Sequence, residues 1–133
     1  MARILIVDDE PDILVILDRM LRKMNHQTIL ASNGKEAVQR LEENPVDLVI
    51  TDLIMPESEG IETIAVIRKR WPGVKIIAMS GGGRQSPVPY LAVAATLGAD
   101  ATLTKPFDRT GLLEALRHVL EPDSPISSPT SRS

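Results

Sequence analysis

The chain has no cysteine, no run of more than three basic residues and no apolar stretch of membrane-spanning length. Without cysteine there are no disulfide bonds, no thiolate nucleophile and no thiolate metal ligand. A formal charge of −3, from 15 basic and 18 acidic residues, argues against nucleic acid as a direct partner. The sequence also starts without a secretory signal, so we expect a soluble, cytoplasmic protein with no membrane partner.

The length of 133 residues, 43% of them hydrophobic, suits one domain with its own core. After Leu120 the sequence is mostly Ser and Pro, which cannot bury enough apolar surface to offset the entropy lost on ordering. We therefore expect one domain over residues 1–120, a disordered tail at 121–133 and no output domain.

Short apolar runs alternate with segments of helical periodicity. The expected strands cover residues 4–7, 27–31, 47–51, 74–79 and 101–104. Helices are expected after the first strand, after Asn33-Gly34, at residues 61–70, at 89–97 and from Asp108. This alternation predicts an α/β fold, in which helices connect the strands of a parallel sheet.

Two helices have patterns that predict which residues face the sheet. In the first, apolar residues three and four apart should form the inward face, namely Ile13, Ile16, Leu17, Met20, Leu21 and Met24. The last helix should begin at Asp108 as a cap, with Phe107 and Leu112 as a hydrophobic staple. Its inward face should comprise Leu112, Ala115, Leu116 and Val119.

Four of the expected strands end at residues that can carry chemistry. They end at Asp8-Asp9, at Asp52, at Ser80 and at Lys105. Because the carboxyl ends of parallel strands open onto one edge of a sheet, we expect these residues to share a pocket.

Three carboxylates at one edge would repel each other, by on the order of 4 kcal/mol for each close pair at an effective dielectric constant of about 20. A hard divalent ion such as Mg²⁺ would offset this repulsion, and Lys105 would supply a second positive charge. A carboxylate such as Asp52 can attack phosphorus to form an acyl phosphate, with Ser80 donating a hydrogen bond to the transferred group.

Each residue also has a simpler interpretation. Asp8-Asp9 alone is more often a turn or a helix cap, and a lone Lys105 or Ser80 is usually a surface residue. Their common place at strand ends favours the site. The glycines at 81–83 lack the spacing of a phosphate-binding loop, so a flexible lid is the better interpretation, with Arg84 meeting the phosphoryl group as a weaker alternative. His26 and His118 lie at no strand end and are assigned to packing or surface.

Together these motifs resemble the receiver domains of two-component response regulators, over residues 3–120. The resemblance rests on Ile6-Val7-Asp8-Asp9-Glu10, Thr51-Asp52-Leu53-Ile54-Met55-Pro56 with Gly60, Met79-Ser80, Gly98-Ala99-Asp100 and Leu103-Thr104-Lys105-Pro106-Phe107. It implies a flavodoxin-like, doubly wound fold, with a five-stranded parallel sheet of order 2-1-3-4-5 and helices on both faces.

The resemblance also implies roles for single residues. Asp52 would be the phosphoacceptor, Asp9 a direct Mg²⁺ ligand, Asp8 a ligand through water, and Ile54 a ligand through its backbone carbonyl. Lys105 would pair with the acceptor and the phosphate.

The switch and partner surface would include Ser80 as the switch hydroxyl, Thr102, Lys105 and Pro106, with a cis peptide between the last two. In this family Thr102 occupies a position that is often aromatic, and the loop at 81–87 is longer than usual.

A histidine kinase or a phosphotransfer protein would donate the phosphate. A downstream protein would bind the surface of the fourth helix, fifth strand and fifth helix. The chain would catalyse only its own phosphorylation and dephosphorylation. Two alternatives stay open: a Mg²⁺-dependent aspartyl-phosphate hydrolase of the haloacid dehalogenase type, and a pseudo-receiver that binds partners without phosphate.

The side chains two positions after Asp52 and after Ser80 are those of Ile54 and Gly82, which offer no polar group to position an attacking water. We therefore expect the phosphorylated protein to lose its phosphoryl group slowly when no partner is present. Loss of a radioactive phosphate label within seconds in Mg²⁺ buffer would contradict this expectation.

Overall fold

The computed structural model describes residues 2–53, 59–81, 98–105 and 107–120, and its centre is a five-stranded sheet. The strands are β1 (Arg3–Val7), β2 (Gln27–Ala31), β3 (Leu48–Asp52), β4 (Lys75–Gly81) and β5 (Ala101–Lys105). All neighbouring strands are parallel, and their order is β2-β1-β3-β4-β5. The predicted fold class and strand order are confirmed.

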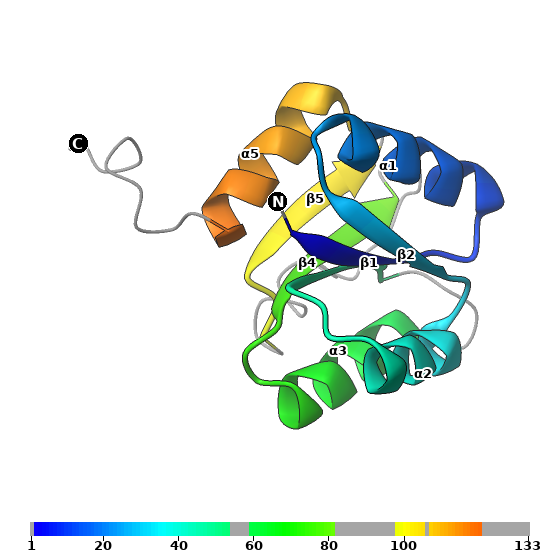
Figure 1. Cartoon of the computed structure of the whole chain (residues 1–133). Coiled ribbons are helices and arrows are strands. Elements are labelled where there is room, and N and C mark those ends of the chain that lie inside the picture. Colours follow the sequence, from blue (N-terminus) through cyan, green and yellow to red (C-terminus); the bar gives the residue numbers. More distant parts are fainter. Residues whose placement is uncertain (1, 54–58, 82–97, 106, 121–133) are drawn as a thin grey trace.

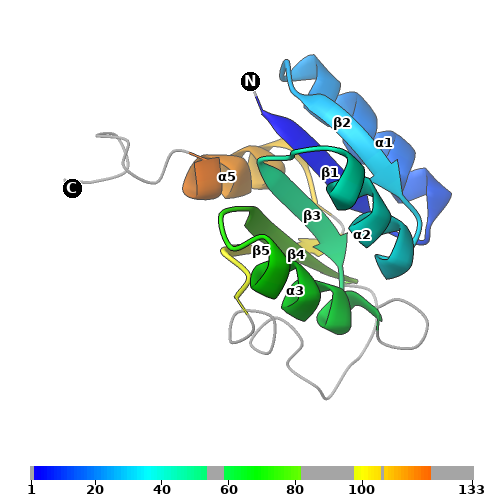
Figure 2. The ribbon, with the colours of Figure 1, turned by 60° about the horizontal axis from the view of Figure 1, so that its bottom comes forward.

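Helices cover both faces of this sheet (Figure 1). They are α1 (Pro11–Lys23), α2 (Gly34–Glu43), α3 (Glu59–Arg70) and α5 (Arg109–Leu120). Helices α1 and α5 lie on one face and α2 and α3 on the other, as a second view shows (Figure 2). Within the described segments, no helix has the length and apolar character needed to cross a membrane. The predicted helix at 89–97 and the tail at 121–133 lie outside the described residues.

The strands build two separate cores because successive side chains point to opposite faces. On β1, Ile4 and Ile6 join the core under α1 and α5, whereas Leu5 and Val7 join the core under α2 and α3. All four are completely buried. A strand with both faces covered has a continuous apolar sequence, which explains the short apolar runs.

Side-chain caps start two of the helices. Asn33 Oδ1 accepts a hydrogen bond from Glu36 N at 2.8 Å, and Glu36 Oε1 accepts one from Ser32 N at 2.6 Å. Asp108 Oδ1 accepts one from Gly111 N at 2.8 Å, which confirms the predicted cap of the last helix. The bonds from Glu36 N and Gly111 N satisfy backbone donors that the first helical turn leaves unpaired.

Some sequence expectations were wrong in detail. Ile16 was expected to face the sheet but is 47% exposed. A helix turns by about 100° per residue, which places Ile16 at the margin of the stripe formed by the other apolar residues of α1. Helix α3 begins at Glu59 rather than 61, and β3 is Leu48–Asp52 rather than 47–51. Strand β4 continues through Ser80, which therefore lies within the strand.

The inward face predicted for the last helix is confirmed, since all four of its residues are buried. Met79 is fully buried, and Met20 and Met24 pack against the same core. Phe107 also packs there, against the cluster that contains Leu112.

His26 lies between α1 and β2 and is partly buried. Its Nδ1 accepts a hydrogen bond from Ala2 N at 3.0 Å, which requires an unprotonated ring nitrogen. Burial lowers the pKa of His26 below its usual 6.5, because the charged ring is poorly solvated there.

Acid should therefore reduce stability through His26. Above about pH 6.5 the ring is neutral in both the folded and the unfolded protein. Below this pH the unfolded chain takes up a proton before the folded protein does, so the free energy of unfolding falls. We expect the free energy of unfolding of His26→Gln to vary less with pH than that of wild type. Urea denaturation between about pH 7.5 and pH 5.5, roughly one unit either side of 6.5, measures this difference. The exposed histidine variant His118→Gln should keep the wild-type slope. Equal slopes for wild type and His26→Gln would refute the assignment.

Candidate functional site

The carboxyl ends of the central strands meet at one edge of the sheet. The registers pair Val7 with Thr51, Asp52 with Met79, and Gly81 with Lys105. The last residues of β1, β3, β4 and β5 are thus neighbours in space, as the sequence predicted. Asp8 directly follows β1.

The ammonium group of Lys105 lies between the carboxylates at this end of the sheet. Its Nζ donates to Asp8 Oδ2 at 2.8 Å, to Asp52 Oδ2 at 3.1 Å and to Glu10 Oε1 at 3.3 Å. Asp8 is fully buried and Asp52 is 3% exposed, so two of these ion pairs are shielded from water. Glu10 is 62% exposed at its side chain, and its pair with Lys105 is weaker for that reason.

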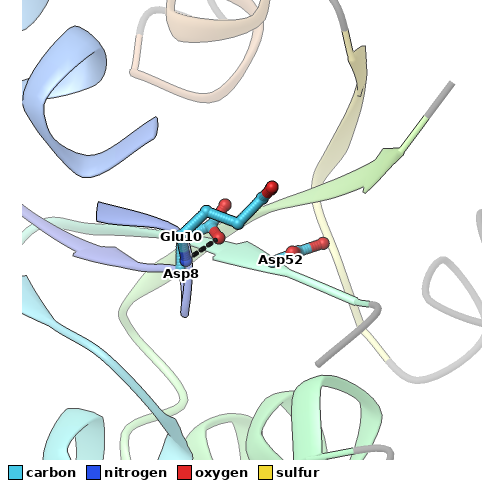
Figure 3. Close-up of side chains that lie close together, drawn as sticks. All are labelled: Asp8, Glu10 and Asp52. Atoms are coloured by element: carbon cyan, nitrogen blue, oxygen red, sulfur yellow. Dashed lines mark hydrogen bonds between the residues drawn. The ribbon is translucent and has the colours of Figure 1, made fainter. Parts of the chain in front are cut away.

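Backbone geometry holds Asp8 in place. Its N donates to Ala31 O at 3.1 Å, which continues the β1–β2 ladder by one bond. Its Oδ1 accepts from Glu10 N at 2.9 Å while its Oδ2 binds Lys105. Figure 3 shows the Glu10 side chain extending over Asp8 toward Asp52. Glu10 is the N-cap residue of α1 but forms no side-chain cap, which leaves its carboxylate available to the site.

The electrostatics of the site follow from burial and charge. Burial raises the pKa of Asp8, since a carboxylate without water is costly, and the hydrogen bond from Lys105 opposes that rise. Burial also disfavours the charged form of Lys105, but its hydrogen bond to Asp8 and the charges of Asp52 and Asp8 outweigh this effect. The pKa of Lys105 is therefore well above its usual range. One ammonium faces three carboxylates, so the site favours a further cation.

The carboxylates are close enough to share such a cation. Oxygen atoms of Asp8, Glu10 and Asp52 all lie within 4.8 Å of one another. The donors are oxygens only, with no imidazole or thiolate among them, and this set suits a hard ion such as Mg²⁺ rather than zinc or copper. The residues therefore fit the metal that the sequence implied.

The structure brings together three of the predicted site residues, Asp8, Asp52 and Lys105. Asp9 is exposed and is not part of the carboxylate group found among the described residues, so its ligand role stays a prediction. Glu10 was not predicted as a site residue. Its place directly after the acidic pair was the available signal, but the pattern did not show that its side chain turns toward Lys105.

Two other predicted residues lie on strands near this edge. Ser80 is half-buried on β4 and lies opposite Thr104 of β5. Thr102 is exposed on β5. Ile54, Arg84, Pro106 and most of the loop at 81–87 lie outside the described residues, so the proposed carbonyl ligand, cis peptide and lid stay predictions.

Residues 4–117 match the family model for the response regulator receiver domain. The chain is 37% identical over 118 residues to the chemotaxis protein CheY of Thermotoga maritima, covering 88% of this chain and 96% of that protein. It is 35% identical over 126 residues to the transcriptional regulatory protein GlrR of Escherichia coli, covering 95% of this chain and 28% of GlrR. The chain thus spans less than a third of the length of GlrR.

Solved structures show the same similarity. The chain superposes on a response regulator receiver domain protein from Clostridium thermocellum with a TM-score of 0.82 and 29% identity, over 92% of this chain and 96% of the other. A CheY-like receiver domain protein from Methanospirillum hungatei gives a TM-score of 0.83 and 29% identity, over 92% and 95%.

Removing the central ammonium should destabilise the protein. In Lys105→Met, three neighbouring carboxylates lose their common partner, and we expect a loss of about 3 kcal/mol in the free energy of unfolding in urea. Added Mg²⁺ should stabilise this variant more than wild type, because the ion replaces the missing positive charge. Lys69→Met, which removes an exposed lysine of α3, is the control. A loss below about 0.5 kcal/mol, typical of a surface substitution, would contradict the expectation.

Proposed function

The chain belongs to the response regulator receiver domain family, and we propose from this membership that Asp52 accepts a phosphoryl group in a two-component or phosphorelay system. The observation that carries the proposal is the buried Asp52 carboxylate, held 3.1 Å from Lys105 Nζ beside two further acids. Receiver domains are signalling modules that histidine kinases phosphorylate, and they are typically not enzymes toward other substrates.

The proposed reaction needs little covalent chemistry from the protein. An Asp52 carboxylate oxygen attacks phosphorus, the P–N bond of a phosphohistidine breaks, and its electron pair stays on the leaving imidazole nitrogen. Lys105 already touches the attacking carboxylate and would offset negative charge on the transferred group. Mg²⁺, when bound, supplies the second positive charge at the phosphoryl oxygens.

For the metal we propose the ligands Asp8, Asp9, Asp52 and the backbone carbonyl of Ile54. The grouping of Asp8 with Asp52 at the sheet edge supports the first and third of these. The exposed position of Asp9 beside Asp8 leaves its carboxylate accessible to an ion.

The switch would act through Lys105 and the neighbouring strand ends. Phosphorylation of Asp52 adds negative charge next to Lys105, whose three carboxylate contacts would have to rearrange. Ser80 and Thr102 lie on the two strands beside this site, and with Pro106 they form the proposed switch surface. A histidine kinase or phosphotransfer protein would be the donor and another protein the target, in the cytoplasm.

A test of the phosphoacceptor uses wild type and Asp52→Asn with Mg²⁺ and acetyl phosphate, followed by intact-protein mass spectrometry. We expect wild type to gain the mass of one phosphoryl group and Asp52→Asn to gain none, because an amide is not a nucleophile here. Asp108→Asn removes an exposed acid and keeps a capping side chain, so it should behave as wild type.

Modification of Asp52→Asn at the wild-type level would show that another residue is the acceptor. Catalytic turnover of a phosphate monoester by wild type would instead favour a hydrolase of the haloacid dehalogenase type.

A further inference from the structure

Arg68, near the end of α3, binds two segments of the chain at the end of the sheet opposite to the site. Its Nη1 donates to Pro72 O at 2.9 Å and to Val74 O at 3.0 Å, both in the turn that leads into β4. Its Nη2 donates to Gly98 O at 2.7 Å and to Asp100 Oδ2 at 2.8 Å, just before β5. One planar guanidinium thus fixes the starts of two neighbouring strands relative to each other.

Asp100 continues this connection into the sheet. Its Oδ2 accepts from Ile76 N at 2.8 Å, and its own N donates to Ile76 O at 2.7 Å. The next residue pair in the ladder is Ile77 with Ala101, where β5 begins. Asp100 therefore fixes which residue of β5 lies opposite which residue of β4.

Gly98 lets the backbone pass close to the Arg68 side chain. Its φ of +116° is rare for residues with a side chain, and a Cβ at this position would lie 2.9 Å from Arg68 Nε. Backbone conformation and space both require glycine where the chain passes the guanidinium. Arg68, Gly98 and Asp100 act as one unit, called here the β5 clamp.

Strand β5 has few apolar contacts of its own, so the β5 clamp adds to the interactions that hold its register. Among the described strands it lies at the edge of the sheet and pairs with β4 alone. Leu103, which is 7% exposed, is its one buried apolar side chain, while Thr102 and Thr104 are exposed. A shift by one residue would turn Lys105 away from the pocket and Leu103 out of the core under α1 and α5, since period-two alternation moves every side chain to the other face.

We propose that the β5 clamp sets the register and depth of β5 and so positions Lys105 against Asp52, which makes Arg68 and Asp100 positioning residues for phosphoryl transfer. The inference rests on the proposed function of Asp52. Asp100 and Lys105 are five residues apart, about 17 Å along a strand. A displacement of about 1 Å at a reacting group can reduce a rate roughly a hundredfold.

The test uses the full chain with Arg68→Lys, which keeps the charge but cannot reach both pairs of acceptors from one ammonium. Three quantities are measured under conditions where circular dichroism shows a folded protein. They are the rate of Asp52 phosphorylation by acetyl phosphate at saturating Mg²⁺, the Mg²⁺ affinity by calorimetry, and the NMR signal of the Lys105 side chain.

We expect the phosphorylation rate to fall roughly tenfold and the Lys105 signal to shift, because Lys105 moves with β5. The Mg²⁺ affinity should stay within about twofold, since the acidic residues of the site lie on β3 and in the turn after β1. Asp100→Asn is a second variant, which keeps an acceptor for Ile76 N and loses the charge opposite Arg68. It should show the same pattern to a lesser degree.

The matched control is Arg70→Lys. Arg70 lies two residues further along the chain and forms an exposed ion pair with Glu42 of α2 at 2.8 Å. It should leave all three quantities unchanged.

Two results would overturn the proposal. In the first, both clamp variants keep the wild-type rate and the wild-type Lys105 signal. In the second, the rate and the Mg²⁺ affinity fall together, which would indicate general loosening of the fold. If wild type itself is not phosphorylated, the proposed function fails, and the Lys105 signal still reports whether the clamp positions β5.

Discussion

A buried ammonium surrounded by carboxylates is the interaction on which this molecule depends. Lys105 arrives on the edge strand and ties Asp8 and Asp52 together from 97 and 53 residues away in the sequence. Removing either partner from such a pair leaves an uncompensated buried charge. The same arrangement leaves excess negative charge, so the groups that hold the strand ends together also suit a further cation.

The parallel sheet explains why the site forms where it does. Its ladder of hydrogen bonds fixes the strands over their length, and Asp52 and Lys105 lie in the last residue pairs of that ladder. Two aliphatic cores cover the two faces of the sheet, and the polar groups of the site lie at the carboxyl ends of its strands. At the opposite end, Arg68 and Asp100 hold the start of β5 against β4, whereas Lys105 holds the end of β5 against Asp52 of β3 and Asp8.

The chain is similar to proteins of very different length. The chain covers nearly all of CheY from Thermotoga maritima and about a quarter of GlrR from Escherichia coli. A site built entirely from one sheet edge explains this range, because no side chain from another domain is needed among Asp8, Glu10, Asp52 and Lys105.

The sequence by itself determined the alternation of strands and helices, the core face of α5 and most of the core face of α1. It also identified the residues at the strand ends, because hydrophobic periodicity and strand-end position are local signals. Sheet order and the roles of Asp52 and Lys105 followed from resemblance to a family. Only the tertiary structure decided that Glu10 turns toward Lys105, that Ile16 faces solvent and that Arg68 reaches Asp100. These contacts depend on side-chain direction and on the packing of segments distant in sequence, which no local pattern encodes.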